Sequence, residues 1–255
     1  RQSDALYQHW ENLPVLLEDA LKFKIEKIIV STKPRPHEGS YMPVFNAGKN
    51  IAHIIGNTLN IPVIELSHQE GHILSASYKN NVNYNESIVY GHLSGGTLEF
   101  VDKNFNIVGK TLDISFGQLI DRTGVALGIQ FPAGKEIDKL AIAYNKADKP
   151  PIKKITVKET DVNISGIENQ INKLIDSKDY SKEAISYFVM KTIADSLKTI
   201  IDNLDYKQVL LSGGVSSSQF LRQYFINTNV MFGRADLCSD NAVGLALSEG
   251  ELPWL

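Results

Sequence analysis

The sequence predicts an α/β protein, because helical and strand patterns alternate along its first third. Apolar residues recur at helical spacing over 13–23, and Lys27–Ser31 then forms a short apolar run typical of a buried strand. A second helix is expected over Val44–Leu59 and a second strand over Ile61–Leu66. With a further helix after residue 67, this α-β-α-β-α order indicates a mainly parallel sheet.

The pattern changes after the asparagine-rich segment 79–85, which we interpret as a surface linker or a lobe boundary. Short turns separate the next strands, which we therefore expect to be antiparallel. These three strands are expected over 87–93, 97–101 and 106–112. Further helices are expected over 114–127, 134–144, 166–175 and 181–203, near 218 and from 241, with strands over 155–157, 208–211 and 230–232. We expect two lobes, residues 1–85 with 240–255 and residues 86–239.

Composition limits the possible classes of protein. Over 255 residues, 43% are hydrophobic and 22% charged, which excludes a disordered or fibrous chain. A net charge of −3 gives no overall basic surface, so nucleic-acid binding would need a local patch or a partner subunit. The single cysteine, Cys238, excludes an internal disulfide, and no apolar run is long enough for a membrane span. We expect a cytoplasmic location. Because the chain opens on Arg1 without a methionine, we expect it to be part of a longer protein.

The segment His68-Gln-Glu-Gly-His72 predicts a metal site. Two histidines four residues apart lie on one face of a helix, so both imidazoles can face the same cation. The strand before them would place them at the carboxyl edge of a sheet, where ligands of α/β proteins gather. Glu70 lies about 200° around the helix from His68 and would point away from the ion, which argues against peptidase chemistry. The alternative is a pair of surface or capping histidines.

Two strand-to-turn passages, Leu93-Ser-Gly-Gly96 and Leu211-Ser-Gly-Gly214, are nearly identical. Paired glycines leave backbone N–H groups uncovered, so a phosphate or a ribose can approach them closely. The alternative for each is a tight turn that needs a positive φ. Because the passage occurs twice, and the second leads into a helix start at Ser216-Ser-Ser-Gln, we favour a nucleotide held between the lobes.

Asp240 and Asn241 precede the last expected helix. A carboxylate at this place can cap the helix by accepting hydrogen bonds from its first N–H groups. With His68 and His72 it becomes a candidate third metal ligand. Two imidazoles and one carboxylate suit iron(II), zinc or manganese, and the identity of the ligands does not decide among them.

Six blocks of the chain together resemble the tRNA threonylcarbamoyladenosine synthases, a family once called glycoproteases or O-sialoglycoprotein endopeptidases. The blocks are His68–His72, Leu93–Gly96, Asp113 through Gly117 to Asp121–Arg122, Leu127–Gly134, Leu211–Val215 and Asp240–Asn241. Their combination is specific, although no single block is. The resemblance implies an actin- or hexokinase-like ATPase fold, with two lobes and a cleft between them.

The resemblance also implies ligands, partners and site residues. It implies one divalent metal ion, iron or zinc, at His68, His72 and Asp240. It implies an adenine nucleotide or threonylcarbamoyl-adenylate at Leu93, Ser94, Gly95, Gly96, Asp121, Gly134, Gly213, Gly214 and Ser218. The expected partners are tRNA, bound by a local patch or through partner subunits, and a second copy or a related family member in a dimer. No membrane association is expected.

The chain departs from the family pattern at three places. Family members usually read Ser-Gly-Gly-His-Thr where this chain reads Ser94-Gly-Gly-Thr97, so one histidine is absent. Their asparagine at the end of the second glycine turn is Ser218 here, and a hydroxyl has less reach and fewer hydrogen-bonding functions than an amide. The family's amino-terminal β-hairpin, whose strands belong to the central sheet, is missing. We therefore expect a divergent paralogue or a fragment, in which Lys27–Ser31 or Ile61–Leu66 pairs with another chain or with an upstream segment.

The leading functional hypothesis is transfer of threonylcarbamoyl from its adenylate to the exocyclic amine of a tRNA adenosine next to the anticodon. A metal ion would orient the carbamoyl group and polarise its carbonyl. No side chain stands out as a general base. The alternative is a catalytically impaired regulatory or scaffold paralogue that binds nucleotide and metal, and a metallopeptidase is a distant third. The lysine- and proline-rich segment 147–158 is interpreted as a solvated surface, with nucleic-acid contact as the alternative.

Overall fold

A computed structural model of the chain describes residues 2–145, 150, 154–239 and 241–253. The chain divides into two compact units. We call residues 1–78 with 240–255 the discontinuous unit and residues 79–239 the central unit. Within the described ranges, no helix has the length and apolar character needed to cross a bilayer.

The discontinuous unit is built on two parallel strands, as the sequence pattern predicts. Its elements are α1 (Gln2–Ala20), β1 (Ile28–Lys33), α2 (Phe45–Leu59), β2 (Val63–Ser67), α3 (His68–Ser77) and α9 (Ala242–Ser248). On one face, Leu66 of β2 packs with Leu74 of α3 and Leu245 of α9. Helices α3 and α9 approach so closely that a Cβ added at Gly244 would lie 2.3 Å from the carbonyl oxygen of Gly71. This packing fixes α3, which begins directly after β2.

The central unit is built on a mixed five-stranded sheet in the order β5-β4-β3-β8-β9. Its strands are β3 (Ile88–Leu93), β4 (Leu98–Val101), β5 (Ile107–Lys110), β8 (Gln208–Ser212) and β9 (Val230–Phe232). The pairs β3–β4 and β4–β5 are antiparallel, which confirms the sequence prediction for these three strands. Strands β3 and β8 are parallel neighbours, and His92 pairs with Ser212 near the end of each strand. The two glycine turns therefore begin at the same edge of the sheet.

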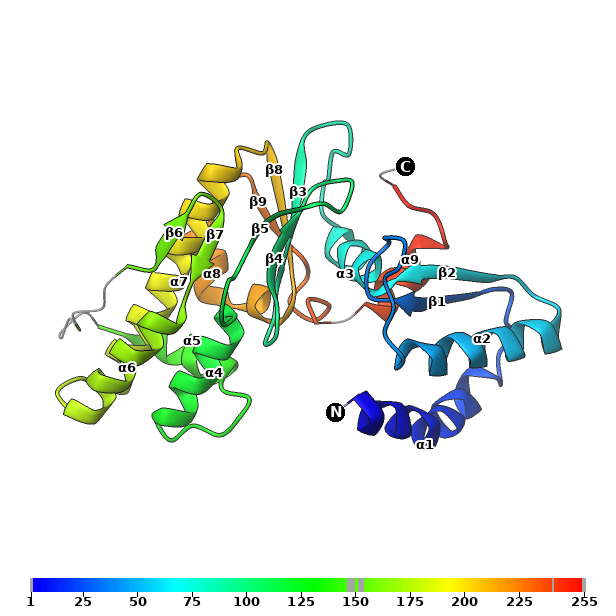
Figure 1. Cartoon of the computed structure of the whole chain (residues 1–255), viewed down its shortest axis with the longest axis horizontal. Coiled ribbons are helices and arrows are strands. Elements are labelled where there is room, and N and C mark those ends of the chain that lie inside the picture. The colour runs from blue at the N-terminus through cyan, green and yellow to red at the C-terminus, as the bar shows by residue number, and fades with distance from the viewer. Residues whose placement is uncertain (1, 146–149, 151–153, 240, 254–255) are drawn as a thin grey trace. The chain divides into compact units, whose positions relative to one another are not determined.

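Helices gather on one face of this sheet (Figure 1). They are α4 (Phe116–Ala126), α5 (Gly134–Ala143), α6 (Ser165–Ser177), α7 (Lys182–Leu204) and α8 (Gln219–Tyr224), with the 3-10 helix η1 (Gly214–Ser217) and the hairpin β6 (Thr156–Lys158) and β7 (Asp161–Asn163). The core includes Leu93 and Phe100 from the sheet, Phe116 from α4, and Ile193 and Leu197 from α7, all fully buried. The long α7 is buried along most of its length, so it provides a rigid support for the shorter helices.

The structure differs from the sequence predictions in three places. Helix α1 begins at Gln2 instead of residue 13 and continues through Pro14, a residue that normally begins or interrupts a helix. Strand β7 was not predicted, since three residues with only one apolar side chain give no strand pattern. The turn after Gly213 continues as η1, so α8 begins later than Ser216. Half of the lysine- and proline-rich segment, residues 147–149 and 151–153, lies outside the described residues.

Candidate functional site

The two glycine turns meet at the edge of the sheet, and their glycines serve different purposes. Gly213 has φ +89°, and a Cβ there would lie 2.2 Å from the carbonyl oxygen of Leu93, so the backbone itself requires glycine. Gly95, Gly96 and Gly214 lack a positive φ, and a Cβ at any of them would meet open space. The tight-turn interpretation therefore explains Gly213 alone. The other three glycines leave backbone uncovered, which suits close approach by a ligand.

The first glycine turn is held firmly against α4. The Ser94 hydroxyl oxygen accepts a hydrogen bond from the Thr97 N–H (3.0 Å), and the Ser115 hydroxyl donates to the Gly95 carbonyl (3.0 Å). A Cβ at Gly117 would lie 2.4 Å from the carbonyl oxygen of Ser94 and 2.6 Å from the Cα of Gly95. Helix α4 therefore packs directly on the turn, and this contact fixes the position of Gly95.

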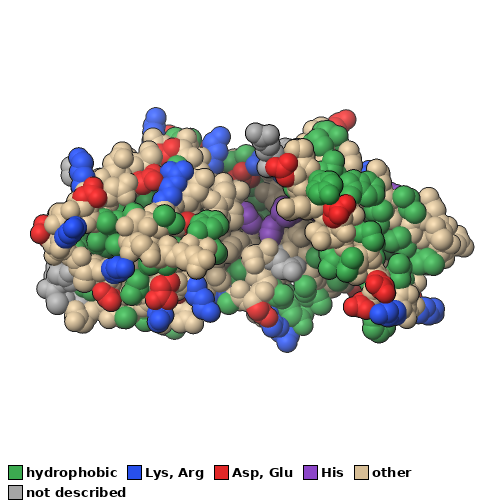
Figure 2. All heavy atoms as spheres, turned by 90° about the horizontal axis from the view of Figure 1, so that it is seen from below, with side chains coloured by type: hydrophobic (Ala, Val, Ile, Leu, Met, Phe, Trp, Pro, Cys, Tyr) green, Lys and Arg blue, Asp and Glu red, His purple; other side chains and the backbone are tan. Residues whose placement is uncertain are grey.

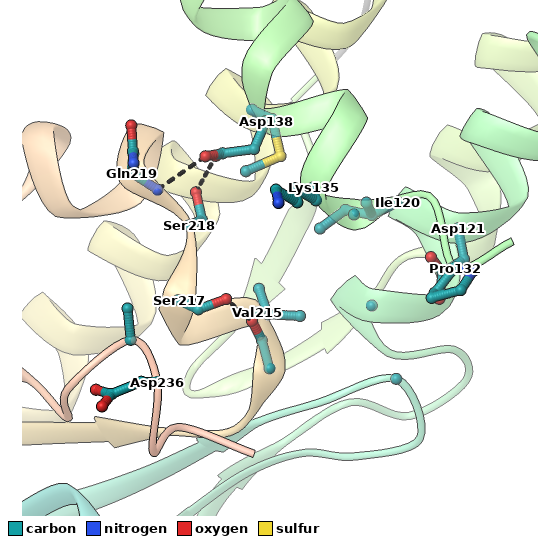
Figure 3. A pocket seen from close by; sticks show the side chains of 16 residues that line it. Ile120, Asp121, Pro132, Lys135, Asp138, Val215, Ser217, Ser218, Gln219 and Asp236 are labelled. Carbon is teal, nitrogen blue, oxygen red and sulfur yellow. Dashed lines mark hydrogen bonds between the residues drawn. The ribbon is translucent and has the colours of Figure 1, made fainter. Parts of the chain in front are cut away.

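A pocket of about 630 Å³ opens beside both turns within the central unit (Figure 3). Five of the residues predicted to bind nucleotide line it, namely Gly95, Asp121, Gly134, Gly214 and Ser218. The other four, Leu93, Ser94, Gly96 and Gly213, are not lining residues. Leu93 is fully buried in the core, and the Ser94 hydroxyl is used inside its own turn. We call this cavity the first pocket.

Asp138 and Ser218 form one hydrogen-bonded group at one side of the first pocket (Figure 3). Ser218 donates its O–H to Asp138 Oδ1 and accepts from the Leu221 N–H (3.1 Å), so it caps α8. The Asp138 carboxylate also accepts from the N–H groups of Gln219 (2.9 Å) and Phe220 (3.2 Å). The single hydroxyl proton of Ser218 is used in its contact with Asp138. The Ser218 side chain can therefore only accept a hydrogen bond from a ligand.

The other charged lining residues are Asp121, Lys135 and Asp236. One oxygen of Asp121, Oδ1, accepts from the Ala133 N–H (2.8 Å) just before α5. Lys135 is exposed in the first turn of α5. Hydrogen bonds from Arg234 (3.0 and 2.6 Å) engage both oxygens of Asp236 and hold the pKa of this carboxyl below its usual value. The arrangement leaves Asp121 Oδ2 and the Lys135 ammonium as charged groups available to a bound molecule.

Sequence reasoning did not identify several lining residues. They are Gly117, Ile120, Pro132, Lys135, Asp138, Met190, Val215, Ser217, Gln219, Ala235 and Asp236. A signal existed for Asp138, because it lies four residues after Gly134 on the same face of α5. Asp236 lies on a loop after β9, and its position depends on a tertiary fold that no local pattern encodes.

The predicted histidine pair comes together at the start of α3. The Nε2 atoms of His68 and His72 lie 3.1 Å apart, with the rings nearly perpendicular at 81°. Two nitrogen ligands of one ion, each bound at about 2.0–2.1 Å, are separated by about 3 Å, so this spacing fits a shared cation. Glu70 instead forms a capping box with Ser67, whose N–H donates to its carboxylate (2.6 Å). This contact explains why Glu70 does not join the histidines.

The predicted third ligand, Asp240, lies outside the described residues. Across the described part of the chain, no group of three or more His, Cys, Asp and Glu residues is arranged to hold an ion. The neighbouring Asn241 is the N-cap residue of α9, but its amide makes no cap hydrogen bond and contacts Nδ1 of the His68 ring. Amide oxygen and nitrogen are exchangeable by a flip, so Asn241 can accept from Nδ1–H and leave His68 Nε2 free to bind a cation.

Structural comparison confirms the fold. A crystal structure of full-length HypF in the phosphate- and nucleotide-bound form superposes with a TM-score of 0.58 and 14% identity, over 91% of this chain and 47% of HypF. Component A of the (R)-2-hydroxyglutaryl-CoA dehydratase of Acidaminococcus fermentans gives a TM-score of 0.50 and 14% identity. The superposition covers 74% of this chain and 70% of the component A chain. The chain thus has the α/β, actin/hexokinase-like ATPase fold that its sequence resemblance implies.

Sequence comparison identifies the family. The family described as tRNA N6-adenosine threonylcarbamoyltransferase (TsaD) matches residues 3–247. A protein of that name from Mycoplasmopsis synoviae is 28% identical over 94% of this chain and 81% of its own length. Another from Nanoarchaeum equitans is 31% identical over 77% of this chain and 61% of its own length. The chain therefore belongs to the tRNA N6-adenosine threonylcarbamoyltransferase family.

Proposed function

We propose that the chain transfers threonylcarbamoyl from threonylcarbamoyl-adenylate to the exocyclic amine of a tRNA adenosine next to the anticodon. In this reaction the amine attacks the carbamoyl carbonyl, the bond from that carbon to the phosphate oxygen breaks, AMP leaves, and the amine loses a proton. The observation that carries the proposal is the first pocket, which gathers Gly95, Asp121, Gly134, Gly214 and Ser218 from four separate segments of the central unit. Relatives named for this activity support it.

In this proposal the first pocket binds the adenylate through backbone and side-chain groups. Asp121 Oδ2 accepts a hydrogen bond from a ribose hydroxyl, while Oδ1 stays bound to the Ala133 N–H. Gly95 and Gly214 let the phosphate approach the backbone, because no Cβ stands in the way. Lys135 supplies a positive charge to the same pocket. No lining side chain needs to act as a general base, because the weakly basic adenine amine can lose its proton to water after attack.

We propose His68, His72 and Asp240 as the residues that would hold a divalent metal, iron or zinc. The 3.1 Å separation of the two imidazole nitrogens supports this assignment. When bound, such an ion polarises a carbonyl oxygen as a Lewis acid. The chain's own contribution is orientation, because the capping box at Ser67 and Glu70 fixes the first turn of α3 and Asn241 contacts the His68 ring.

The test of the proposal is a transfer assay with the full chain, a divalent metal, threonylcarbamoyl-adenylate and an unmodified tRNA transcript. Digestion to nucleosides and mass spectrometry detect the product. Asp121→Asn is the informative variant, because its amide oxygen can still accept from the Ala133 N–H while its NH₂ replaces the acceptor offered to ribose. We expect the wild-type chain to form product and Asp121→Asn to need about tenfold more adenylate, as the loss of a charged hydrogen bond predicts. Absence of product with the wild-type chain contradicts the proposal.

One observation favours a second candidate, a family member that binds nucleotide without transferring the group. Ser218 stands where the family usually carries asparagine, and its hydroxyl proton is already donated to Asp138. Ser218 therefore cannot donate to the substrate the hydrogen bond that an asparagine amide at this position could donate. Under this alternative, nucleotide binds but no modified nucleoside forms, and Ser218→Asn raises adenylate affinity.

We also propose that the discontinuous unit pairs with another chain, either a second copy or a related family member. Helix α1 exposes Tyr7, Trp10, Val15 and Leu16, and apolar side chains gather on this part of the surface (green, right part of Figure 2). Strands β1 and β2 pair only with each other among the described residues, so each has an edge that another strand could extend. Light scattering should give a mass above one chain for the wild type and a monomer for Leu16→Glu. Ile226→Glu, equally exposed but in the central unit, is the control.

A further inference from the structure

A second cavity of about 630 Å³ adjoins the first pocket in the central unit. We call it the side pocket, and its lining residues are Gly95, Gln118, Asp121, Arg122, Val125, Ala126, Phe131, Glu168 and Asn172. Gly95 and Asp121 line both cavities. The loop between α4 and α5 also serves both, because Phe131 lines the side pocket and Pro132 the first pocket. A molecule in the side pocket would thus lie directly beside the molecule in the first pocket.

The side pocket exposes apolar surface that the fold itself does not need. Phe131 is 68% exposed and Val125 is 54% exposed, although both are large and apolar. Phe131 is therefore not a core residue. Its neighbour Ala133, two residues later, is fully buried and anchors the loop against α4. The loop thus presents an aromatic face from a fixed support.

Polar groups surround this aromatic face. Gln118 uses its side-chain oxygen in the α4 capping box with Ser115, so its NH₂ is the group directed to other partners. Arg122 binds both carboxylate oxygens of Glu168 through Nη1 (3.2 and 3.0 Å), which ties α4 to α6 at the rim. Asn172 is exposed and offers a second amide. A flat aromatic group whose edge carries hydrogen-bond donors and acceptors matches this combination.

We propose that the side pocket binds an unstacked nucleobase of the RNA acceptor, with Phe131 as the stacking platform. This inference rests on the proposed transfer of a group to RNA. Sequence-specific RNA recognition commonly uses single-stranded bases that stack on aromatic side chains and form hydrogen bonds along their edges. Among the described residues of the central unit, Lys and Arg mix with Asp and Glu on the face seen in Figure 2 (left part) and form no continuous basic surface there. A stacked base therefore supplies an anchor that phosphate contacts alone would not give. Phe131 is a positioning residue, because it holds the acceptor and does not touch the reacting atoms.

The test compares Phe131→Ala and Phe131→Trp with the wild type in the full chain. Ile226→Ala is the matched control, since Ile226 is 70% exposed in the same unit and lines none of the described pockets. Fluorescence anisotropy measures affinity for a labelled anticodon stem-loop, and steady-state kinetics separate kcat from KM for tRNA. Calorimetry with AMP reports the first pocket independently. A photo-crosslinking amino acid at position 131 identifies the contacted nucleotide.

We expect Phe131→Ala to weaken stem-loop binding and raise KM for tRNA by about 5- to 150-fold, the range for loss of one stacked base, with kcat and AMP affinity unchanged. Phe131→Trp should restore binding, and the crosslink should map to a single-stranded loop nucleotide. Unchanged RNA affinity in Phe131→Ala overturns the inference. An equal loss of RNA affinity in Ile226→Ala, or a loss of AMP affinity in Phe131→Ala, also overturns it. So does a wild type that binds AMP but no stem-loop, or a crosslink to a partner protein instead of RNA. A wild type that binds no adenine nucleotide contradicts the proposed function itself.

Discussion

The contact between α4 and the first glycine turn predicts a large effect for Gly117→Ala. The new Cβ would lie 2.4 Å from the Ser94 carbonyl oxygen and 2.6 Å from the Gly95 Cα. Ordinary contacts are about 3.5–4 Å, so backbone atoms must move by about 1 Å. Such overpacking costs about 1–3 kcal/mol, which lowers the Tm of a unit of this size by about 2–12 °C. Since Gly95 lines the first pocket, we also expect AMP affinity to fall, by about 5- to 150-fold when the same 1–3 kcal/mol is lost from binding, because 1.4 kcal/mol is a factor of ten.

Gly166→Ala is the matched control for this prediction. Gly166 is the second residue of α6, just as Gly117 is the second residue of α4, but a Cβ at Gly166 would meet nothing within 4 Å. Alanine there should leave stability unchanged or raise it by up to about 1 kcal/mol, through its higher helix propensity. Thermal unfolding followed by circular dichroism, with and without AMP, measures both variants. If Gly117→Ala is as stable as Gly166→Ala and binds AMP equally well, the proposed packing of α4 against the turn is wrong.

Three further predictions concern other parts of the structure. Asp138→Ala removes the acceptor for the first N–H groups of α8 and should cost about 2–3 kcal/mol in chemical denaturation, whereas Asp138→Asn, which keeps an acceptor, should cost less. Asn241→Ala removes the contact to the His68 ring and should weaken metal binding about 10- to 100-fold in chelator competition; equal affinity would contradict a supporting role. A hydrogen bond from Lys49 lowers the pKa of Glu65 from 4.5 to about 2, so its carboxylate stabilises the fold above pH 4.5 and this contribution is lost as pH falls toward 2. The stability difference between wild type and Glu65→Gln should shrink over that range, and a constant difference would refute the assignment.

Periodicity predicted most of the fold, because the long apolar stripes and strands are local signals. The helix over Val44–Leu59 begins at Phe45 and ends at the expected residue, and the three strands after the asparagine-rich segment pair as their short turns require. Strand order could not be predicted in the same way. The pairing of β3 with β8 joins residues 120 positions apart, such as Ile88 and Gln208, and no local pattern records it.

The candidate site shows the same division between local and tertiary signals. Helical spacing alone predicted that His68 and His72 would converge, and their Nε2 atoms lie 3.1 Å apart. Asp138 was missed, because its helical spacing from Gly134 does not by itself distinguish it from an ordinary helix-surface carboxylate. Its partner Ser218 is 80 positions away. Ser218 was predicted as a substrate contact, and the structure shows that its proton is already used within the fold.

Calorimetric titration of the full chain with AMP, in the presence of a divalent metal, tests the central claim most directly. The first pocket predicts one binding site per chain, with affinity reduced about tenfold or more in Asp121→Asn, because only the acceptor offered to ribose changes. Circular dichroism of Asp121→Asn should match the wild type, since the hydrogen bond from the Ala133 N–H is retained. Absence of binding by the wild-type chain, or equal affinity for AMP in the two proteins, would contradict the assignment of this pocket to the adenylate.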